Sequence, residues 1–285
     1  MANEEQIAQW NGEAGEHWAQ RDARMSEVLA PFSAAVMEHA GVDGAKAALD
    51  IGCGGGSQTL ALAERLGPDA SVLGVDVSGP LLAIAEAQRT AHPAGERVRF
   101  ERGDASAYDF SPAGFDLLFS RFGVMFFDAP AQAFLHLRGA AKPGAKLAFC
   151  CWRELSSNPF VAVPLQAALS VLPPPPPPTP RAPGPFAFAE HDYLGGLLDE
   201  AGWTSIDITP RHIPMRWGGH EDFSTTVHEL VNLGPIGRML SEAKADDATR
   251  DAVYDTAEEL LAPFYMNRAL HMDGAVWLVT ASNGD

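Results

Sequence analysis

Cysteine is scarce in this 285-residue chain, which has only Cys53, Cys150 and Cys151. An odd number of cysteines without a regular spacing argues against a disulfide framework and is typical of a reducing compartment. Cys150 and Cys151 are adjacent in a segment that resembles a strand, so their side chains should point to opposite faces of a sheet. The sequence therefore predicts thiols packed in the core, with no redox pair and no metal site.

Basic residues are also few. The chain has 20 Lys and Arg against 37 Asp and Glu, which gives a formal net charge of −17. Binding to nucleic acid depends mainly on basic side chains that neutralise phosphates, so this balance argues against a nucleic-acid partner. A strong net charge also keeps a protein in solution, which is the simplest reading of the acidity.

Long hydrophobic runs are missing as well. No apolar run approaches the roughly 20 residues that a membrane-spanning helix needs. The opening segment MANEEQIAQW is polar and acidic, unlike a secretory signal peptide. We therefore expect a cytoplasmic protein without a membrane partner, whose oligomeric state the sequence leaves open.

What the sequence does contain is a regular alternation of apolar strand patterns and amphipathic helix patterns. Strand patterns occur at residues 47–51, 71–77, 97–104, 115–122 and 146–152, and helix patterns between them at 57–66, 79–91 and 130–141. The fourth strand pattern is almost continuously apolar, as expected for a strand buried on both faces. The alternation predicts an α/β fold in which helices cover both faces of a doubly wound parallel sheet.

Outside residues 45–152 the pattern is looser. Helix patterns cover residues 4–40, 159–172 and 191–202 and occur twice within 220–264, and strand patterns cover 203–210 and 274–282. Between them, PPPPPPTPRAPGP at residues 173–185 can form neither a helix nor a strand. It predicts an extended loop, which is either a spacer or the edge of an active-site lid.

The first strand-to-helix turn is the first candidate site, because ligands of such sheets bind at the carboxyl ends of the strands. The turn lies in LDIGCGGGSQTLALAERL, residues 49–66. A Walker-type phosphate loop requires Gly-Lys-Ser/Thr, and no lysine stands here. The dinucleotide pattern G-x-G-x-x-G has Ser57 or Thr59 at its third glycine position, so it is incomplete. An acidic-x-G-x-G-x-G pattern is complete, at Asp50, Gly52, Gly54 and Gly56.

Two more carboxylates follow the next two strand patterns. Asp76 ends the second and Asp104 follows the third. With these motifs in this order, residues 45–152 resemble the class I S-adenosylmethionine-dependent methyltransferases. The ligand of that family has an amino acid tail, a sulfonium cation and a nucleoside but no phosphate. Glycines let the backbone pass close to such a tail and to the ribose.

The resemblance implies S-adenosylmethionine as the cofactor and assigns roles to the three carboxylates. Asp50 would lie near the α-amino group, and Asp76 would accept hydrogen bonds from the ribose hydroxyls. The alternative for Asp76 is a helix cap, although Ser78 is better placed for that. Asp104 would hold the adenine amino group, next to the backbone N–H of Ala105. The same family pattern implies cofactor contacts from Val77 and Ser120.

The likeness extends to a bacterial subgroup near the ubiquinone/menaquinone-biosynthesis methyltransferases, and it covers nearly the whole chain. The shared segments are WNG..G..W at 10–18, SRFGVMFF at 120–127, CWR....NPF at 151–160 and GPFAFA at 184–189. The resemblance implies a seven-stranded Rossmann-like sheet whose last strand is antiparallel and lies before the sixth, with an added helical lid.

This resemblance also divides the chain, which we expect to be a single methyltransferase domain over residues 1–285. Its expected parts are an N-terminal helical cap at 1–41, a cofactor-binding core at 45–152, lid or substrate-binding insertions at 153–190 and 211–264, and a final strand at 274–282.

The acceptor is marked by no motif, because methyl transfer mainly requires an oriented nucleophile and the exclusion of water. Small-molecule sites are mostly apolar and aromatic. The candidate substrate-binding residues are therefore aromatic, although each is also an ordinary core residue: Trp10, Trp18, Phe126, Trp152, Phe160 and Trp217.

Two polar residues are candidates for a catalytic role. Arg121 stands at the end of a central strand pattern, where an arginine is rarely buried without a partner. It could pair with the cofactor carboxylate, with a substrate anion or with a nearby Asp. His17 is the candidate general base, because the opening segment of the family folds over the cofactor.

The sequence thus predicts methyl transfer to a small, partly apolar metabolite, with a hydroxyl as the favoured acceptor group. The N-P-P-Y signature of many amino-N-methyltransferases is absent after the fourth strand pattern, where SRFG stands instead. Two alternatives remain open: a methyltransferase that acts on a macromolecule such as tRNA or protein, and a cofactor-binding protein without methyl transfer.

Overall fold

The computed structural model describes residues 3–110, 114–177, 179–219 and 221–284. The chain divides into two compact units. Unit 1 comprises Met1–Trp152, Arg181–Arg211 and Val276–Asp285, and unit 2 comprises Arg153–Pro180 and His212–Ala275.

The sheet begins with five parallel strands in unit 1. They are β1 (Ala47–Ile51), β2 (Ser71–Asp76), β3 (Val98–Arg102), β4 (Phe115–Arg121) and β5 (Ala141–Trp152). Their order is β3-β2-β1-β4-β5, so the strand order reverses between β1 and β4. Ligands of such sheets bind at this reversal, at the carboxyl ends of the strands.

Two long strands complete the sheet. β8 (Ala269–Asn283) runs antiparallel to β5, and β6 (Trp203–Gly218) is its other neighbour. Each of the two strands has residues in both units. The predicted fold class and the antiparallel strand before the sixth are confirmed. The structure adds a two-residue strand, β7 (Tyr265–Met266), which pairs with β8 and makes the sheet eight-stranded.

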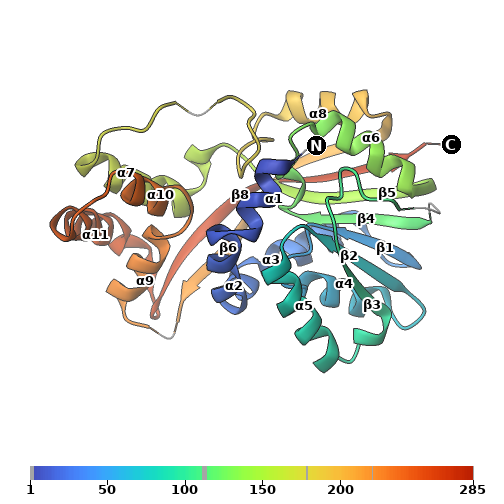
Figure 1. Ribbon diagram of the computed structural model, residues 1–285, viewed down its shortest axis with the longest axis horizontal. Coiled ribbons are helices and arrows are strands. Elements are labelled where there is room, and N and C mark those ends of the chain that lie inside the picture. The colour runs from blue at the N-terminus through green and yellow to red at the C-terminus, as the bar shows by residue number, and fades with distance from the viewer. Residues whose placement is uncertain (1–2, 111–113, 178, 220, 285) are drawn as a thin grey trace. The chain divides into compact units, whose positions relative to one another are not determined.

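Helices cover both faces of the sheet in unit 1 (Figure 1). One face carries α3 (Asp22–Ala40), α4 (Ser57–Leu66) and α5 (Gly79–Ala91), and the other carries α6 (Pro130–Ala140) and α8 (His191–Glu200). The central strand β4 is buried between these layers. Its residues Leu117, Leu118 and Phe119 are each at most 1% exposed, as the apolar run predicted.

The N-terminal helical pattern forms three helices, α1 (Glu4–Asn11), α2 (Glu13–Gln20) and α3. Gly12 ends α1 with an extended conformation, and Arg21 separates α2 from α3. The apolar positions Met25, Val28 and Phe32 lie on the buried face of α3 at the spacing typical of one face of a helix.

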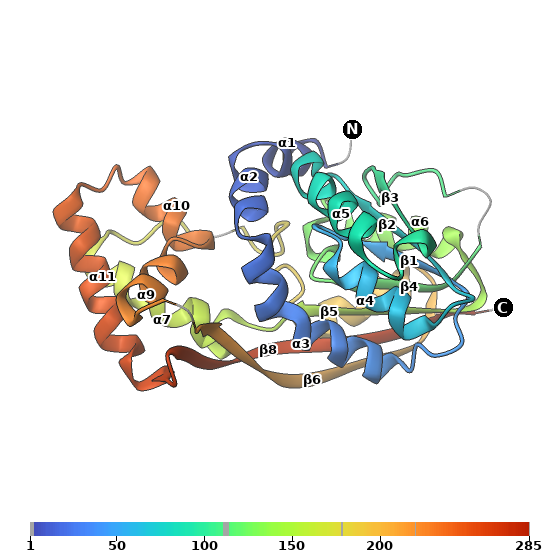
Figure 2. The ribbon, with the colours of Figure 1, turned by 90° about the horizontal axis from the view of Figure 1, so that it is seen from below.

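Unit 2 contains a group of α-helices (Figure 2). They are α7 (Pro159–Val171), α9 (Phe223–Val231), α10 (Gly234–Glu242) and α11 (Asp247–Leu261). The described residues 221–264 thus hold three α-helices where the sequence predicted two helices. Asp222 and Asp246 begin α9 and α11, each accepting a hydrogen bond from a backbone N–H of the first turn. In the proline-rich loop, residues 173–177 and 179–185 form neither helix nor strand.

The three cysteines are buried free thiols. Within the part of the chain that the structure describes, no helix is both long and apolar enough to cross a membrane. The same residues include no group of three or more histidines, cysteines and carboxylates suited to a metal ion.

Candidate functional site

The glycine loop after β1 has a conformation that depends on its glycines. Gly52, Gly54 and Gly56 have φ angles of 68°, 54° and 85°, in the left-handed region that other residues rarely adopt. A Cβ at Gly52 would lie 2.7 Å from the Cα of Gly123, and a Cβ at Gly56 would lie 2.6 Å from the ring of Phe100. The glycines of the motif thus let the loop backbone lie close to Gly123 and to the ring of Phe100.

Ser120 joins the end of β4 to this loop. Its buried Oγ donates a hydrogen bond to the carbonyl of Ile51 (2.8 Å) and accepts one from the N–H of Gly123 (3.1 Å). The side chain thereby fixes the two strand ends at which the strand order reverses. Its predicted contact with the cofactor stays a prediction.

Asp50 lies beneath the loop and is fully buried. Its two carboxylate oxygens accept hydrogen bonds from Gln58 Nε2 (2.8 Å) and from Thr59 Oγ1 (2.6 Å). Burial raises the pKa of Asp50 to about 6, and the two hydrogen bonds oppose the rise. Both partners belong to the first turn of α4, so the carboxylate links β1 to that helix.

Asp76 ends β2 and faces the same loop. Its Oδ2 accepts a hydrogen bond from the N–H of Gly54 and its Oδ1 accepts one from the N–H of Ser78, both at 2.8 Å. Burial raises the pKa of Asp76, while these backbone donors lower it. Ser78 is the cap of α5, as expected, because its Oγ accepts from the N–H of Leu81. Each carboxylate oxygen retains acceptor capacity for a ribose hydroxyl.

Asp104, after β3, is engaged by the N-terminal segment. Nδ2 of Asn3 donates to both of its oxygens, at 2.9 and 3.0 Å, and Ser106 donates to Oδ1. Asn3 is itself 4% exposed, and its Oδ1 accepts from the N–H of Asp128 at 2.7 Å. Ala105, the neighbour of Asp104, is buried. Sequence reasoning missed Asn3, because a single asparagine before a helix carries no motif.

A second asparagine of this segment contacts the loop after β2. Asn11 Nδ2 donates to the carbonyl of Val77 (2.9 Å), and its Oδ1 accepts from the N–H of Gly79 (3.1 Å). Gly15, in the same WNG..G..W motif, has no room for a side chain, since a Cβ would lie 1.9 Å from the carbonyl oxygen of Trp10. The motif thus positions the N-terminal helices against the strand ends. Sequence reasoning missed Asn11, although this motif was a signal that could have identified it.

The first residue of α3 reaches the glycine loop. A Cβ placed at Gly55 would lie 2.0 Å from Oδ1 of Asp22, so the carboxylate rests against the loop backbone. Gln88 Nε2 donates to Asp22 Oδ2 at 3.0 Å. Burial raises the pKa of Asp22. Sequence reasoning missed this residue, because its proximity depends on how α3 folds back on the sheet.

Arg121, at the end of β4, is half-buried. Its Nη1 donates to Ser33 Oγ of α3 at 3.2 Å, and its Nε is buried without a hydrogen-bond partner. Burial lowers the pKa of Arg121, while the charges of Cys150, Asp50 and Asp22 raise it. No carboxylate among the described residues lies within ion-pair distance, although two carboxyl groups are close enough to act on its charge.

The aromatic candidates form two groups in unit 1. Trp10 lies 6.1 Å from Trp18 and 5.4 Å from Phe126 between ring centroids. Trp152 stacks on Phe122 at 4.1 Å with nearly parallel rings. Phe122 has a φ of 65°, which is unusual for a bulky residue and indicates local strain immediately after β4. Sequence reasoning had not singled out Phe122.

The remaining candidate residues belong to neither of these two aromatic groups. His17 is exposed on α2, and its backbone carbonyl accepts a hydrogen bond from Arg21. Phe160, in α7, and Trp217, in β6, belong to unit 2. The structure therefore brings together Trp10, Trp18 and Phe126, while a single pocket that contains all six aromatic residues stays a prediction.

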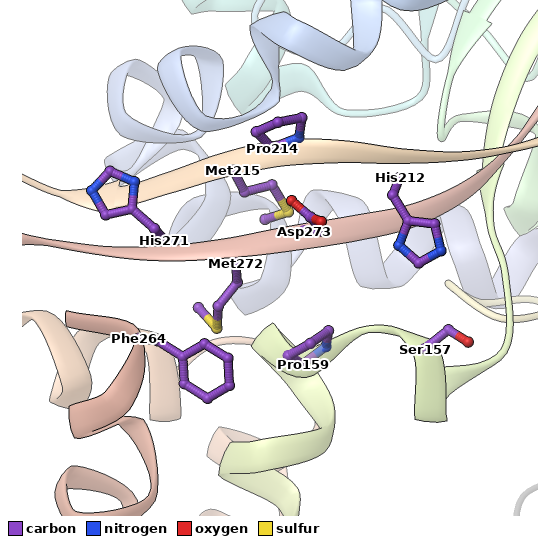
Figure 3. Close-up of a pocket in the computed structure, with 9 residues that line it drawn as sticks. All are labelled: Ser157, Pro159, His212, Pro214, Met215, Phe264, His271, Met272 and Asp273. Atoms are coloured by element: carbon purple, nitrogen blue, oxygen red, sulfur yellow. The ribbon is translucent and has the colours of Figure 1, made fainter. Parts of the chain in front are cut away.

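Unit 2 has a pocket of its own, with a volume of about 400 Å³. It is lined by His212, Pro214 and Met215 of β6, by His271, Met272 and Asp273 of β8, and by Ser157, Pro159 and Phe264. Figure 3 shows Met272 pointing toward Phe264, with His212 and His271 at opposite ends of the view. The lining combines thioether and aromatic groups with a few polar ones, which is the usual composition of a small-molecule site.

The comparison with protein families matches residues 48–144 to the methyltransferase domain. This segment contains β1 to β4 and the glycine loop. Demethylmenaquinone methyltransferase of Lactiplantibacillus plantarum is 37% identical over 99 residues, which are 35% of this chain and 42% of that protein. The enzyme of the same name from Lactobacillus johnsonii is 25% identical over 170 residues, 57% of this chain and 69% of that protein. The chain thus spans less than half the length of the first relative.

Solved structures share the fold. Phosphoethanolamine N-methyltransferase 2 of Haemonchus contortus, in complex with phosphomonomethylethanolamine and S-adenosylhomocysteine, superposes with a TM-score of 0.52. The superposition covers 89% of this chain and 52% of that chain, at 18% sequence identity. At this identity the likeness establishes the architecture alone.

Proposed function

We propose that the protein transfers a methyl group from S-adenosylmethionine to a small-molecule acceptor. The premise is that residues 48–144 match the methyltransferase domain and resemble the class I S-adenosylmethionine-dependent methyltransferases. The observation that carries the proposal is the arrangement of Asp50, Asp76 and Asp104 at the carboxyl ends of three neighbouring strands, around a glycine loop in left-handed conformation. In this arrangement Asp76 could accept from two ribose hydroxyls and Asp104 from an adenine amino group, while the buried Asp50 supports the loop from beneath.

The acceptor that we propose is small and partly apolar. The net charge of −17 disfavours a polyanion such as tRNA. The Trp10, Trp18 and Phe126 group in unit 1 and the thioether-lined pocket of unit 2 both favour a flat or apolar molecule. Two relatives named demethylmenaquinone methyltransferase make a quinone-like ring the first compound to test.

Two finer parts of the proposal concern the chemistry and the closure of the site. A hydroxyl acceptor would need a base, for which His17 is the candidate, and replacing it with Ala should lower turnover. Residues 153–190 and 211–264 would act as a lid that excludes water during transfer. Hydrogen exchange of these residues should slow when S-adenosylhomocysteine binds, and exchange unaffected by the ligand would contradict the lid.

The test of the function has two parts. Calorimetry should show micromolar binding of S-adenosylhomocysteine and no binding of NAD or ATP, and NAD bound more tightly would contradict the proposal. Radiolabelled S-adenosylmethionine should then be incubated with quinones, phenols, tRNA and proteins. Label in tRNA or protein alone would support the macromolecular alternative, and cofactor binding without S-adenosylhomocysteine production would support the alternative without methyl transfer.

A further inference from the structure

The side chain of Asn3 contacts the groups after β3 to which the adenine ring is assigned. Its Nδ2 donates to Oδ1 and Oδ2 of Asp104, at 2.9 and 3.0 Å, and to Oγ of Ser106 at 3.1 Å. Asn3 is buried, although none of the residues of α1 that follow it is buried. The contact therefore depends on this one side chain and not on a helix face packed against the sheet.

Asp128 holds Asn3 from the opposite side. It follows the short helix η2 (Val124–Phe126), which comes after β4. The N–H of Asn3 donates to Oδ2 of Asp128 at 2.6 Å, and Oδ1 of Asn3 accepts from the N–H of Asp128 at 2.7 Å. All these residues belong to unit 1. Asn3 thus connects the loops that follow β3 and β4, at the carboxyl ends of the parallel strands.

The carboxylate of Asp104 has no acceptor capacity left for a ligand while Asn3 is in place. Its Oδ1 accepts from the N–H and the Oγ of Ser106, at 2.9 and 2.8 Å, and also from Asn3. Its Oδ2 accepts from Asn3. These contacts use the roughly four lone-pair sites that a carboxylate offers. An adenine amino group that donates to Asp104 must therefore displace Asn3.

This placement of Asn3 leaves α1 without a capping side chain. Asn3 is the N-cap residue of α1, where an asparagine normally accepts a hydrogen bond from a backbone N–H of the first turn. Here the side chain makes no such hydrogen bond, and the backbone has a φ of 61°, in the left-handed region. Once released from Asp104, the same side chain can cap α1. Asn3 therefore has two alternative sets of partners, and a ligand can shift the balance between them.

We propose that Asn3 is an autoinhibitory residue, which occupies the adenine amino site in the free protein and leaves it when the cofactor binds. The inference rests on the proposed function, because it assumes that Asp104 receives the adenine amino group. A carboxamide presents an NH₂ donor beside a carbonyl acceptor, and adenine presents its amino group beside a ring nitrogen acceptor. Asn3 thus imitates the group that it excludes, and it lowers the apparent affinity by the fraction of molecules that are closed.

The experiment measures binding of 5′-methylthioadenosine, which has the adenine ring but no amino acid tail, to the unmodified protein and to two variants. Asn3→Ala removes the contact, whereas Asn3→Asp cannot donate to Asp104 but can still cap α1. By calorimetry, we expect both variants to bind about threefold more tightly, which corresponds to a closed fraction of about two thirds in the unmodified protein.

Binding kinetics give a second measurement, which a merely structural role would not change. Trp10 lies in α1, 5.4 Å from Phe126, so stopped-flow tryptophan fluorescence should report release of the segment. With rising ligand concentration, the observed rate should level off at the opening rate in the unmodified protein and keep rising in both variants. Gln9→Ala, at an exposed position of the same helix, should behave as the unmodified protein does. Circular dichroism would show which variants remain folded.

The outcomes that overturn the inference are distinct from failure of the proposed function. Weaker binding in the folded variants would mean that Asn3 holds Asp104 in position for the ligand. Unchanged affinity in these variants would mean that Asn3 and adenine do not compete. If the unmodified protein and the variants bind neither 5′-methylthioadenosine nor S-adenosylhomocysteine, the proposed function itself is wrong.

Discussion

The candidate sites of unit 1 and unit 2 differ in how strictly they restrict the residue types at their positions. The proposed cofactor site of unit 1 is built from backbone conformations and strand ends, at glycines with positive φ and at a carboxylate that accepts from backbone N–H groups. The pocket of unit 2 is lined by side chains such as Met215, Met272 and Phe264, for which other apolar residues could substitute. A site that constrains the backbone leaves a motif in the sequence, whereas a site made of interchangeable side chains leaves almost none.

The largest effect should follow from a side chain in the glycine loop. Gly52→Ala would place a methyl group 2.7 Å from the Cα of Gly123 at a φ of 68°. We expect the free energy of unfolding to fall by about 4 kcal/mol, as measured by urea denaturation. Gly139→Ala, at a helical position with open space around it, should instead raise stability by about 0.5–1 kcal/mol. Equal changes in the free energy of unfolding for the two variants would contradict the backbone constraint at Gly52.

The second prediction concerns the end of β2. Asp76→Ala removes the proposed acceptor of the ribose hydroxyls, and it should weaken S-adenosylhomocysteine binding by about 2–4 kcal/mol, the loss of two charge-assisted hydrogen bonds. Calorimetry would measure the change. An affinity that stays the same would mean that the ribose lies elsewhere.

The third prediction uses the pKa of Asp50, which burial raises to about 6. A raised pKa in the folded state means that stability is highest when the carboxyl is protonated and is lost as pH rises through about 6. Asp50→Asn cannot ionise, so the difference in unfolding free energy between the natural protein and this variant should shift by about 1.4 kcal/mol against the natural protein from pH 5 to pH 7. Urea denaturation at the two pH values would measure it. A difference independent of pH would show that the hydrogen bonds from Thr59 and Gln58 offset the effect of burial on the pKa of Asp50.

The fourth prediction tests unit 2. Phe264→Ala should lower kcat/KM for the acceptor about tenfold, which corresponds to about 1.4 kcal/mol, and should leave the affinity for S-adenosylhomocysteine within twofold. Leu169→Ala, which alters an exposed side chain of the same unit, should change neither quantity. Loss of cofactor affinity in the Phe264 variant would show that this pocket does not act on the acceptor alone.

The smallest effect is expected from Asn3. Its Nδ2 donates to both oxygens of Asp104, the residue proposed to hold the adenine amino group. Asn3→Ala should free these acceptors and raise the affinity for 5′-methylthioadenosine about threefold, or roughly 0.7 kcal/mol. A weaker affinity in this variant would show that Asn3 holds Asp104 in its binding position instead.

Much of unit 1 was predictable because its elements follow local rules. The strand at 47–51 and the helices at 57–66 and 79–91 have the predicted limits, since glycines and the Ser78 cap define their ends. β6 was predicted at 203–210 but extends to Gly218, because pairing with β8 continues a strand beyond its own apolar pattern. Contacts such as those of Asn3, Asp22 and Phe122 could not be predicted, because they depend on how helices distant in sequence return to the sheet.

The position of β8 has a consequence for the synthesis of the protein. β8 is the last strand in chain order, yet it lies between β5 and β6 and pairs with β5 from Lys146 to Trp152. A nascent chain that has already formed its parallel strands must therefore keep the backbone edge of β5 open until β8 leaves the ribosome. Unpaired strand edges are templates for aggregation. Premature termination before residue 269 should accordingly yield a polypeptide that retains the cofactor motifs but requires chaperones to stay unaggregated.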